Sequence, residues 1–159
     1  MFFLKMKAEN AEKLLSEAEQ TVRKIQSFKL SDPILLTYLA RYLIVYLCGI
    51  YEEAIEEILR QKFSRVRSKY ISAFLSNNVS QSFRNPSFDN VCALLKKFNT
   101  NWERRIKKIP EENKDAITSI VNIKNDLAHR GAATVTLNDA LQYFSKSRVI
   151  IEKIDEIIL

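Results

Sequence analysis

The stretch of sequence that decides the fold is PILLTYLARYLIVYLCGIYEEAIEEILRQKFSR, residues 33–65. Ser31 and Asp32 precede Pro33, and a capping residue followed by proline at the first helical position is a helix start signal. The first part of the stretch is apolar on nearly every side, while beyond Tyr51 four glutamates alternate with apolar residues. A helix that is apolar all round has to be surrounded by other helices. We therefore predict that residues 33–65 form the long central helix of a helical fold.

A glycine, Gly49, lies in the middle of this predicted central helix. Glycine in a helix interior costs about 1 kcal/mol relative to alanine. A second helix that crosses the central helix closely at this point would explain that cost, so we expect such a crossing at Gly49.

The apolar character of this region does not extend far enough to predict a membrane span. The longest apolar run, residues 43–51, is far shorter than the roughly 20 residues that cross a bilayer. The first residues, MFFLKMKAEN, lack the apolar core and the cleavage pattern of a signal peptide. We therefore expect a soluble, cytoplasmic protein with no membrane partner.

Helical periodicity continues on both sides of the central helix. Residues 8–28 have apolar side chains at three- and four-residue steps, which predicts an amphipathic helix. Thr136 and Asp139 resemble a capping box and predict the start of the last helix. Between these ends we predict a polar loop over residues 77–86 and helices over 66–76, 87–98, 100–109 and 110–130. Because no stretch predicts a strand, we expect one all-α domain, a helical bundle covering residues 1–159.

Composition excludes several classes of protein. The chain has 159 residues, of which 47% are hydrophobic, so it can bury a core. With only 2 Gly and 3 Pro it does not fit a turn-dense β-sandwich or a glycine-loop nucleotide fold. One histidine and two cysteines, Cys48 and Cys92, cannot form a disulfide framework or a four-ligand zinc site. We therefore expect reduced thiols, no metal and no other cofactor.

The basic residues are concentrated in one part of the chain. Residues 60–108 hold 12 of the 25 basic residues but only 2 of the 19 acidic ones, so the rest of the chain is acidic on balance. Five cations lie within ten residues, namely Arg60, Lys62, Arg65, Arg67 and Lys69. A second group, beside Trp102, comprises Arg104, Arg105, Lys107 and Lys108. This distribution indicates either a polyanion partner, with single-stranded RNA the best fit, or simply a solvated basic face.

The segment 116–130 has two contrasting faces when it is placed on a helical wheel. One narrow polar stripe contains Thr118, Asn122, Asn125, Asp126 and His129. The opposite arc is apolar and contains Ala116, Ile117, Ile120, Val121, Ile123, Leu127 and Ala128. Lys124 interrupts the apolar arc, either as a side chain that snorkels to solvent or as a cation held in a crevice. His129 can be a binding or catalytic residue, or a cation that stabilises the C-terminal end of its helix.

These residues resemble a known family. IVNIKNDLAHRG is similar to the signature helix of the HEPN superfamily, whose pattern is Arg-Asn-x-x-x-His followed by glycine or a polar residue. The upstream segments LARYLIVYLCGIYEEAIEEIL and FRNPSFDNVCALLKKF resemble the RiboL-PSP and MAE-type HEPN domains of prokaryotic conflict systems. The resemblance covers roughly residues 30–155. It implies a HEPN-like bundle that dimerises, so that two signature helices face each other across a cleft.

The resemblance also implies candidate site residues, because active members of the superfamily are metal-independent endoribonucleases. His129 matches the motif histidine, Asn125 matches the polar residue after the motif arginine, and Lys124 stands where the family has arginine. Metal-free cleavage of RNA needs a base, an acid and a cation, and histidine can act as base or acid at neutral pH. Lys124 could supply the cation and Asn125 could orient the phosphate or the histidine. Asp126 either holds the imidazole tautomer or is a solvated acid.

We therefore predict a metal-independent endoribonuclease that acts as a toxin or antiphage effector. The alternative is a catalytically weak or inactive HEPN module that binds nucleic acid or a partner protein. The expected partners are RNA, a second copy of the chain, and an antitoxin or defence-system protein. The residues expected to bind RNA are Arg60, Lys62, Arg65, Arg67, Lys69 and Arg130.

Overall fold

The computed structural model describes residues 5–130 and 134–159. Within these two ranges all regular structure is helical, which confirms the all-α prediction. The helices are α1 (Glu9–Ser27), α2 (Pro33–Phe63), α3 (Lys69–Ser82), α4 (Phe88–Phe98), α5 (Thr100–Ile106), α6 (Glu111–Arg130) and α7 (Leu137–Ile158).

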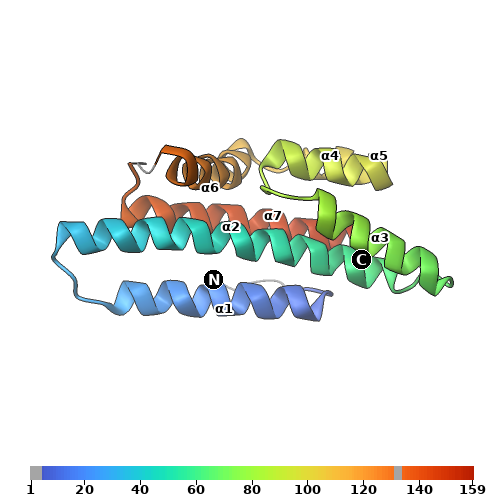
Figure 1. The fold of residues 1–159 in the computed structure, drawn as a ribbon, viewed down its shortest axis with the longest axis horizontal. Coiled ribbons are helices and arrows are strands. Elements are labelled where there is room, and N and C mark those ends of the chain that lie inside the picture. Colours follow the sequence, from blue (N-terminus) through green and yellow to red (C-terminus); the bar gives the residue numbers. More distant parts are fainter. Residues whose placement is uncertain (1–4, 131–133) are drawn as a thin grey trace.

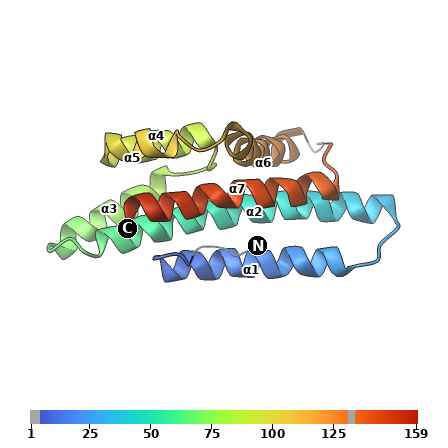
Figure 2. The same cartoon turned by 180° about the vertical axis from the view of Figure 1, so that it is seen from behind.

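The helices form three layers. Figure 1 shows α2 and α7 side by side in the middle layer, with α1 on one side of this pair and α4, α5 and α6 on the other. Figure 2 shows the same arrangement from behind. Helix α3 packs only along the C-terminal half of α2, so it extends the bundle at one end (Figure 1).

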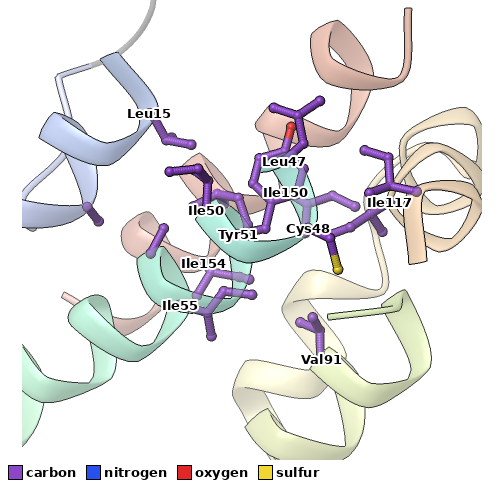
Figure 3. Packing of buried hydrophobic residues seen from close by; sticks show 14 of the residues in the cluster. Leu15, Leu47, Cys48, Ile50, Tyr51, Ile55, Val91, Ile117, Ile150 and Ile154 are labelled. Carbon is purple, nitrogen blue, oxygen red and sulfur yellow. The ribbon is translucent and has the colours of Figure 1, made fainter. Parts of the chain in front are cut away.

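The predicted central helix is confirmed as α2. The side chain of Asp32 caps it and accepts hydrogen bonds from the backbone N–H groups of Ile34 and Leu35, at 2.8 and 3.3 Å. By length and composition alone α2 could cross a membrane, and 39% of its most apolar window is buried within the protein. Its buried side chains form the core with α1, α6 and α7, as seen for Leu15, Tyr51, Ile117 and Ile150 in Figure 3.

The expected helix crossing at Gly49 is wrong. A Cβ atom added to Gly49 would meet no described atom within 4 Å, and the residue is exposed. The reason is that α3 covers this side of α2 only along its C-terminal half, which leaves the N-terminal half open. The open side is an apolar strip, which we call the α2 strip. It consists of Ile34, Tyr38, Tyr42, Val45 and Gly49, of which the four larger residues are 68%, 63%, 55% and 49% exposed.

The predicted loop over residues 77–86 is also partly wrong, because α3 continues to Ser82. The helix starts at Ser68, whose hydroxyl accepts a hydrogen bond from the backbone N–H of Ile71. Tertiary contacts then stabilise the polar second half. Val79 is buried against the bundle, and the Ser80 hydroxyl donates to Oε2 of Glu56 on α2 at 2.6 Å.

Helix α7 holds the beginning of α1 in place. Its own start is the predicted capping box, in which Thr136 and Asp139 exchange hydrogen bonds between side chain and backbone. Near its end, the buried carboxylate of Asp155 accepts hydrogen bonds from the backbone N–H groups of Lys7 and Ala8, at 2.7 and 2.8 Å. Since Ala8 has no side chain that could cap α1, Asp155 takes this role from a distant part of the sequence.

A buried ion cluster joins α1 to α7. Arg148, which is 6% exposed, donates from Nη1 to Glu19 and from Nε to Glu152, both at 2.8 Å. The hydrogen bond from Arg148 is the main reason why the pKa of Glu19 is lowered below its ordinary value of 4.5, and it outweighs the opposing effect of burial. Breaking a buried pair leaves an uncompensated charge, so this cluster is a sensitive point of the fold.

The Glu19 carboxylate should make the fold sensitive to acid. A carboxyl group whose pKa is lower in the folded state contributes stability above its unfolded pKa, and that stability is lost as the pH falls through the folded value. We therefore expect the free energy of unfolding, measured by urea denaturation, to fall as the pH is lowered from about 4.5. Glu19→Gln should weaken this pH dependence. Glu17→Gln, which removes an exposed carboxylate from the same helix, is the control. Equal acid sensitivity in both variants would contradict the assignment.

Candidate functional site

The polar stripe predicted for the segment 116–130 lies on α6, and the two halves of this helix differ in burial. The first half is anchored in the core through Ala116, Ile117, Ile120 and Val121, all at most 3% exposed. Asn113 adds a hydrogen bond from its side-chain amide to the carbonyl of Lys146 on α7, at 2.8 Å. From Asn122 to His129, by contrast, every side chain is half-buried or exposed. The second half of α6 therefore presents its side chains at the surface of a rigidly held helix.

Lys124 is held in place by two amides. Its Nζ donates to Oδ1 of Asn85 at 2.6 Å and to Oδ1 of Asn125 at 3.4 Å. The side chain is half-buried and lies near Cys48 of α2, because the Lys124 charge acts to lower the pKa of that thiol. These contacts show that side-chain oxygens of the protein hold the Lys124 ammonium, which therefore does not extend freely into solvent.

The Asn85 side chain that holds Lys124 comes from a tight turn between α3 and α4. Asn85 has a φ of 55°, a left-handed conformation that asparagine tolerates better than most residues. The turn is fixed from two sides: the backbone N–H of Asn85 donates to Oε2 of Glu52 at 3.3 Å, and Asn90 donates to the Asn85 carbonyl at 2.8 Å. The buried side chains of Phe83 and Pro86 flank it. Asn85 is thus presented to Lys124 by the sequence FRNP.

The sequence places these residues at the end of the predicted polar loop over 77–86 and does not reveal the part that Asn85 plays. Arg84, the neighbouring residue, is already paired with acidic side chains. Its Nη1 lies 3.1 Å from Oε1 of Glu52 and 3.5 Å from Oε1 of Glu56, so two glutamates neutralise its charge. An asparagine before a proline does indicate a tight turn in the sequence. It does not indicate that the asparagine side chain binds Lys124.

His129 is more exposed than Lys124. It is exposed, one residue before the end of α6, and no described residue hydrogen-bonds to it or forms an ion pair with it. Asn122 is exposed, whereas Asn125 and Asp126 are half-buried. Lys124 and His129 are five residues apart, which corresponds to about 140° around a helix. One chain therefore brings together Lys124, Asn125 and Asn85, but directs His129 to a different side of α6.

The basic cluster expected to bind RNA divides into two parts. Arg60 forms an ion pair with Glu57, and the Lys62 ammonium lies 5.8 Å from the centre of the Trp102 ring. Arg65, Arg67 and Lys69 are exposed, and none of the described acidic residues pairs with them. These three lie in the connection between α2 and α3 and at the start of α3. The side chain of Arg130 lies outside the part of the structure that is described.

The second basic group is less available than its sequence indicates. Trp102 is half-buried and packs against the core, so its ring is not an open stacking surface. Lys107 donates to Glu103 at 2.6 Å, and this hydrogen bond raises the pKa of Lys107 and lowers that of Glu103. Arg105 lies 3.6 Å from Glu156 of α7. Trp102 is therefore a packed residue beside a basic helix.

Neither cysteine is suited to nucleophilic chemistry. Both thiols are buried, and burial raises the pKa of Cys48 to about 11 and raises that of Cys92 as well. Figure 3 shows Cys48 inside the bundle, on the side of α2 near Ile117 of α6. Among the described residues, no group of three or more histidine, cysteine or carboxylate side chains could hold a metal ion.

A comparison with known protein families assigns the chain to one of them. The family model described as RiboL-PSP-HEPN matches residues 8–159, essentially the whole chain. The chain belongs to this HEPN family. The HEPN membership expected from sequence is confirmed. The helix that resembles the HEPN signature is α6, which carries Lys124, Asn125 and His129. Neither the curated proteins nor the solved structures searched contained a match.

Membership also limits the class of function. An all-helical HEPN domain is a ribonuclease-type or otherwise nucleic-acid-related module. In this HEPN chain Lys124 is bound by amides, and His129 is exposed on another side of the same helix.

Proposed function

We propose that this HEPN domain is a metal-independent endoribonuclease that cleaves RNA as a homodimer, in the cytoplasm, as a toxin or antiphage effector. The observation that carries the proposal is the state of the signature helix α6. It ends in an exposed imidazole, His129, and it carries a half-buried cation, Lys124, held by two amides. An exposed general acid or base and a fixed cation are what metal-free RNA cleavage requires.

The proposed reaction is an attack of the ribose 2′-oxygen on the adjacent phosphorus. One imidazole accepts the 2′-hydroxyl proton, and a protonated imidazole donates a proton to the departing 5′-oxygen. The P–O5′ bond breaks as the new P–O2′ bond forms, which leaves a 2′,3′-cyclic phosphate and a 5′-hydroxyl end. Lys124 stabilises the extra negative charge on the phosphorane, and Asn125 orients the phosphate. In the assembled dimer the Asp126 carboxylate would accept a hydrogen bond from an imidazole of His129 and so hold one tautomer.

Two copies of the chain would solve the geometric problem of the single one. Because Lys124 and His129 lie on different sides of α6, a complete set of groups needs a second α6 facing the first. The α2 strip offers an apolar surface for this contact, because its four large residues are each about half exposed or more. The strip is also close to Lys124, since Cys48, which lies near Lys124, is the residue before Gly49. Solvent-exposed apolar side chains in such a row are typical of a protein interface.

The assembly makes a direct prediction about mass. We expect light scattering to give about twice 18.5 kDa at micromolar concentration, with Asn122, Asn125, Asp126 and His129 near the two-fold axis. Val45→Arg should convert the dimer to a monomer, because it places a charge in the α2 strip. Gln20→Arg, at an exposed position of α1, is the control. A mass near 18.5 kDa for the unaltered protein would contradict the proposal.

A second candidate function is a non-catalytic HEPN module that binds nucleic acid or a partner protein, such as an antitoxin. The observation in its favour is again Lys124: a lysine replaces the motif arginine, and its two amide contacts also suit a structural cation. Incubation of the purified protein with total RNA in EDTA, beside His129→Ala, separates the two functions. Fragments that form in EDTA and depend on His129 support the enzyme, and intact RNA supports the module.

A further inference from the structure

Helix α3 has one buried side and one open side. Val79 is 2% exposed and Leu75 packs partly against the core, and these residues face α2. On the other side Tyr70 is 77% exposed and Phe74 is 67% exposed. Exposed phenyl and phenol rings one turn apart on a helix are unusual for a side that only contacts water, because each ring leaves a large apolar surface hydrated.

The same side of α3 continues as a row of amides. Asn77 and Gln81 are exposed and follow Tyr70 and Phe74 at helical spacing. At about 100° per residue these four side chains fall within an arc of about 60°, over an axial length of about 16 Å. The open side of α3 is therefore a straight line of two flat rings followed by two groups that can both donate and accept hydrogen bonds.

The charged side chains of this segment of the chain all have one sign. Residues 60–88 contain no aspartate or glutamate. Arg65, Arg67 and Lys69 lie immediately before the line and are not paired with any described acidic residue. The Lys69 ammonium lies 5.2 Å from the centre of the Tyr70 ring, so the cation and the ring occupy the same part of the surface. The surface is complementary to a negatively charged chain.

We propose that the open side of α3 and the preceding connection bind single-stranded RNA, and we call this surface the α3 platform. Its residues are Arg65, Arg67, Lys69, Tyr70, Phe74, Asn77 and Gln81. Bases stack on Tyr70 and Phe74, phosphates contact Arg65 and Arg67, and the amides contact base edges. Aromatic rings beside free cations are the combination that single-stranded nucleic acids require. The inference rests on the proposed function, since it assigns the binding of that enzyme's substrate.

The α3 platform and His129 lie at different ends of the bundle. The platform lies at the end of the bundle where α2 ends, whereas the last turn of α6, with His129, lies towards the end where α2 begins (Figures 1 and 2). The platform therefore holds the strand away from the cleaved bond. It should select single-stranded over paired RNA, because bases within a duplex cannot stack on side chains.

The experiment measures the affinity for an unstructured, fluorescent oligouridine of about 12 nucleotides, long enough for typical single-strand sites. All variants carry His129→Ala so that the RNA stays intact. Tyr70→Ala with Phe74→Ala should weaken binding at least about 10-fold, since each stacked base contributes about 5- to 150-fold. The salt dependence should stay unchanged because stacking releases no counterions. Arg65→Glu with Arg67→Glu should flatten the log–log salt slope by about 0.7 for each phosphate that is no longer bound.

Conservative variants separate stacking from simple hydrophobic contact. Phe74→Tyr keeps a flat ring and should bind RNA like the parent, while Phe74→Leu keeps the apolar character and should lose affinity. Phe28→Ala removes an exposed ring at the end of α1 and is the control. Circular dichroism melts verify that the variants fold, which is expected because every substituted side chain is exposed.

Several outcomes would overturn the platform. They are RNA affinity that is unchanged in the double alanine variant, affinity that Phe74→Leu preserves, or a salt slope that the double glutamate variant leaves intact. Loss of the dimer mass, or of binding to phosphatidylserine vesicles, with RNA affinity retained would assign the surface to a protein or membrane contact instead. If cleavage requires His129 but not Tyr70 and Phe74, the proposed enzyme is supported and the α3 platform is contradicted. If RNA binding requires these rings but the unaltered protein does not cleave RNA, the α3 platform is supported and the proposed enzyme is contradicted.

Discussion

His129→Ala is expected to reduce RNA cleavage by about 10²–10⁴-fold, the usual contribution of a general acid or base. His129 is the one histidine of the chain, so the variant leaves no imidazole that could transfer a proton. A dimer would lose both imidazoles at once, and with them both proton transfers. The measurement is the rate at which 2′,3′-cyclic phosphate ends appear on a labelled RNA in the presence of EDTA.

The exposure of His129 makes this variant informative. Because no described residue hydrogen-bonds to it, its removal should leave the melting temperature close to that of the parent. Gln20→Ala, another exposed helical side chain, lies on α1 across the bundle and is the control for activity and stability. If His129→Ala cleaves RNA at the rate of the parent, the imidazole takes no part in catalysis. The proposed mechanism would then be wrong.

In the proposed mechanism Lys124 should set the rate of RNA cleavage, because it would supply the cation that stabilises the phosphorane. Loss of one well-placed donor to developing negative charge typically costs about 10²–10³ in rate, so Lys124→Ala should abolish detectable cleavage. Lys124→Arg should raise cleavage, since a guanidinium keeps the charge and adds paired donors that match two phosphate oxygens. The parent, with lysine, should therefore be a weak nuclease. Single-turnover rates of the three proteins measure this order.

The structure provides a matched control for Lys124 on the same helix. Lys114 is a partly buried lysine whose ammonium pairs with Glu111 at 2.8 Å, and Lys114→Arg should leave cleavage unchanged. Asn85→Ala removes the 2.6 Å contact to Lys124 and should lower the cleavage rate without altering RNA affinity. If Lys124→Arg shows no cleavage and Lys124→Ala mainly lowers the melting temperature, then Lys124 is a structural cation. The non-catalytic module would then be the better description.

The contacts of Lys124 show what the signature motif alone does not determine. Spacing on a wheel placed Lys124 within the apolar arc of α6 and left two interpretations open. The choice between them depends on Asn85, which is 39 residues earlier and reaches Lys124 only because the turn before α4 adopts a left-handed conformation. A helical wheel describes one helix at a time, so it cannot reveal a partner contributed by a distant turn.

The prediction for α3 failed for a related reason. Asn77, Asn78 and the serines around them resemble a loop when local propensity alone is considered. In the folded chain Val79 is buried against the bundle and Ser80 bonds to Glu56, and these contacts stabilise a helix that the sequence disfavours. The same extension creates the α3 platform, since Asn77 and Gln81 align with Tyr70 and Phe74 only in a continuous helix.

The sequence by itself determined the all-α class, the central position of α2, the caps at Asp32 and Thr136, and the family. Each depends on a pattern within one segment: periodicity, a capping side chain, or a motif on a single helix. Only the tertiary structure decided that Gly49 lies on an open strip, that Trp102 is packed, and that the basic cluster divides into paired and unpaired cations. Exposure and pairing are properties of surfaces formed by segments distant in the chain, because a side chain becomes buried or neutralised only when another segment packs against it.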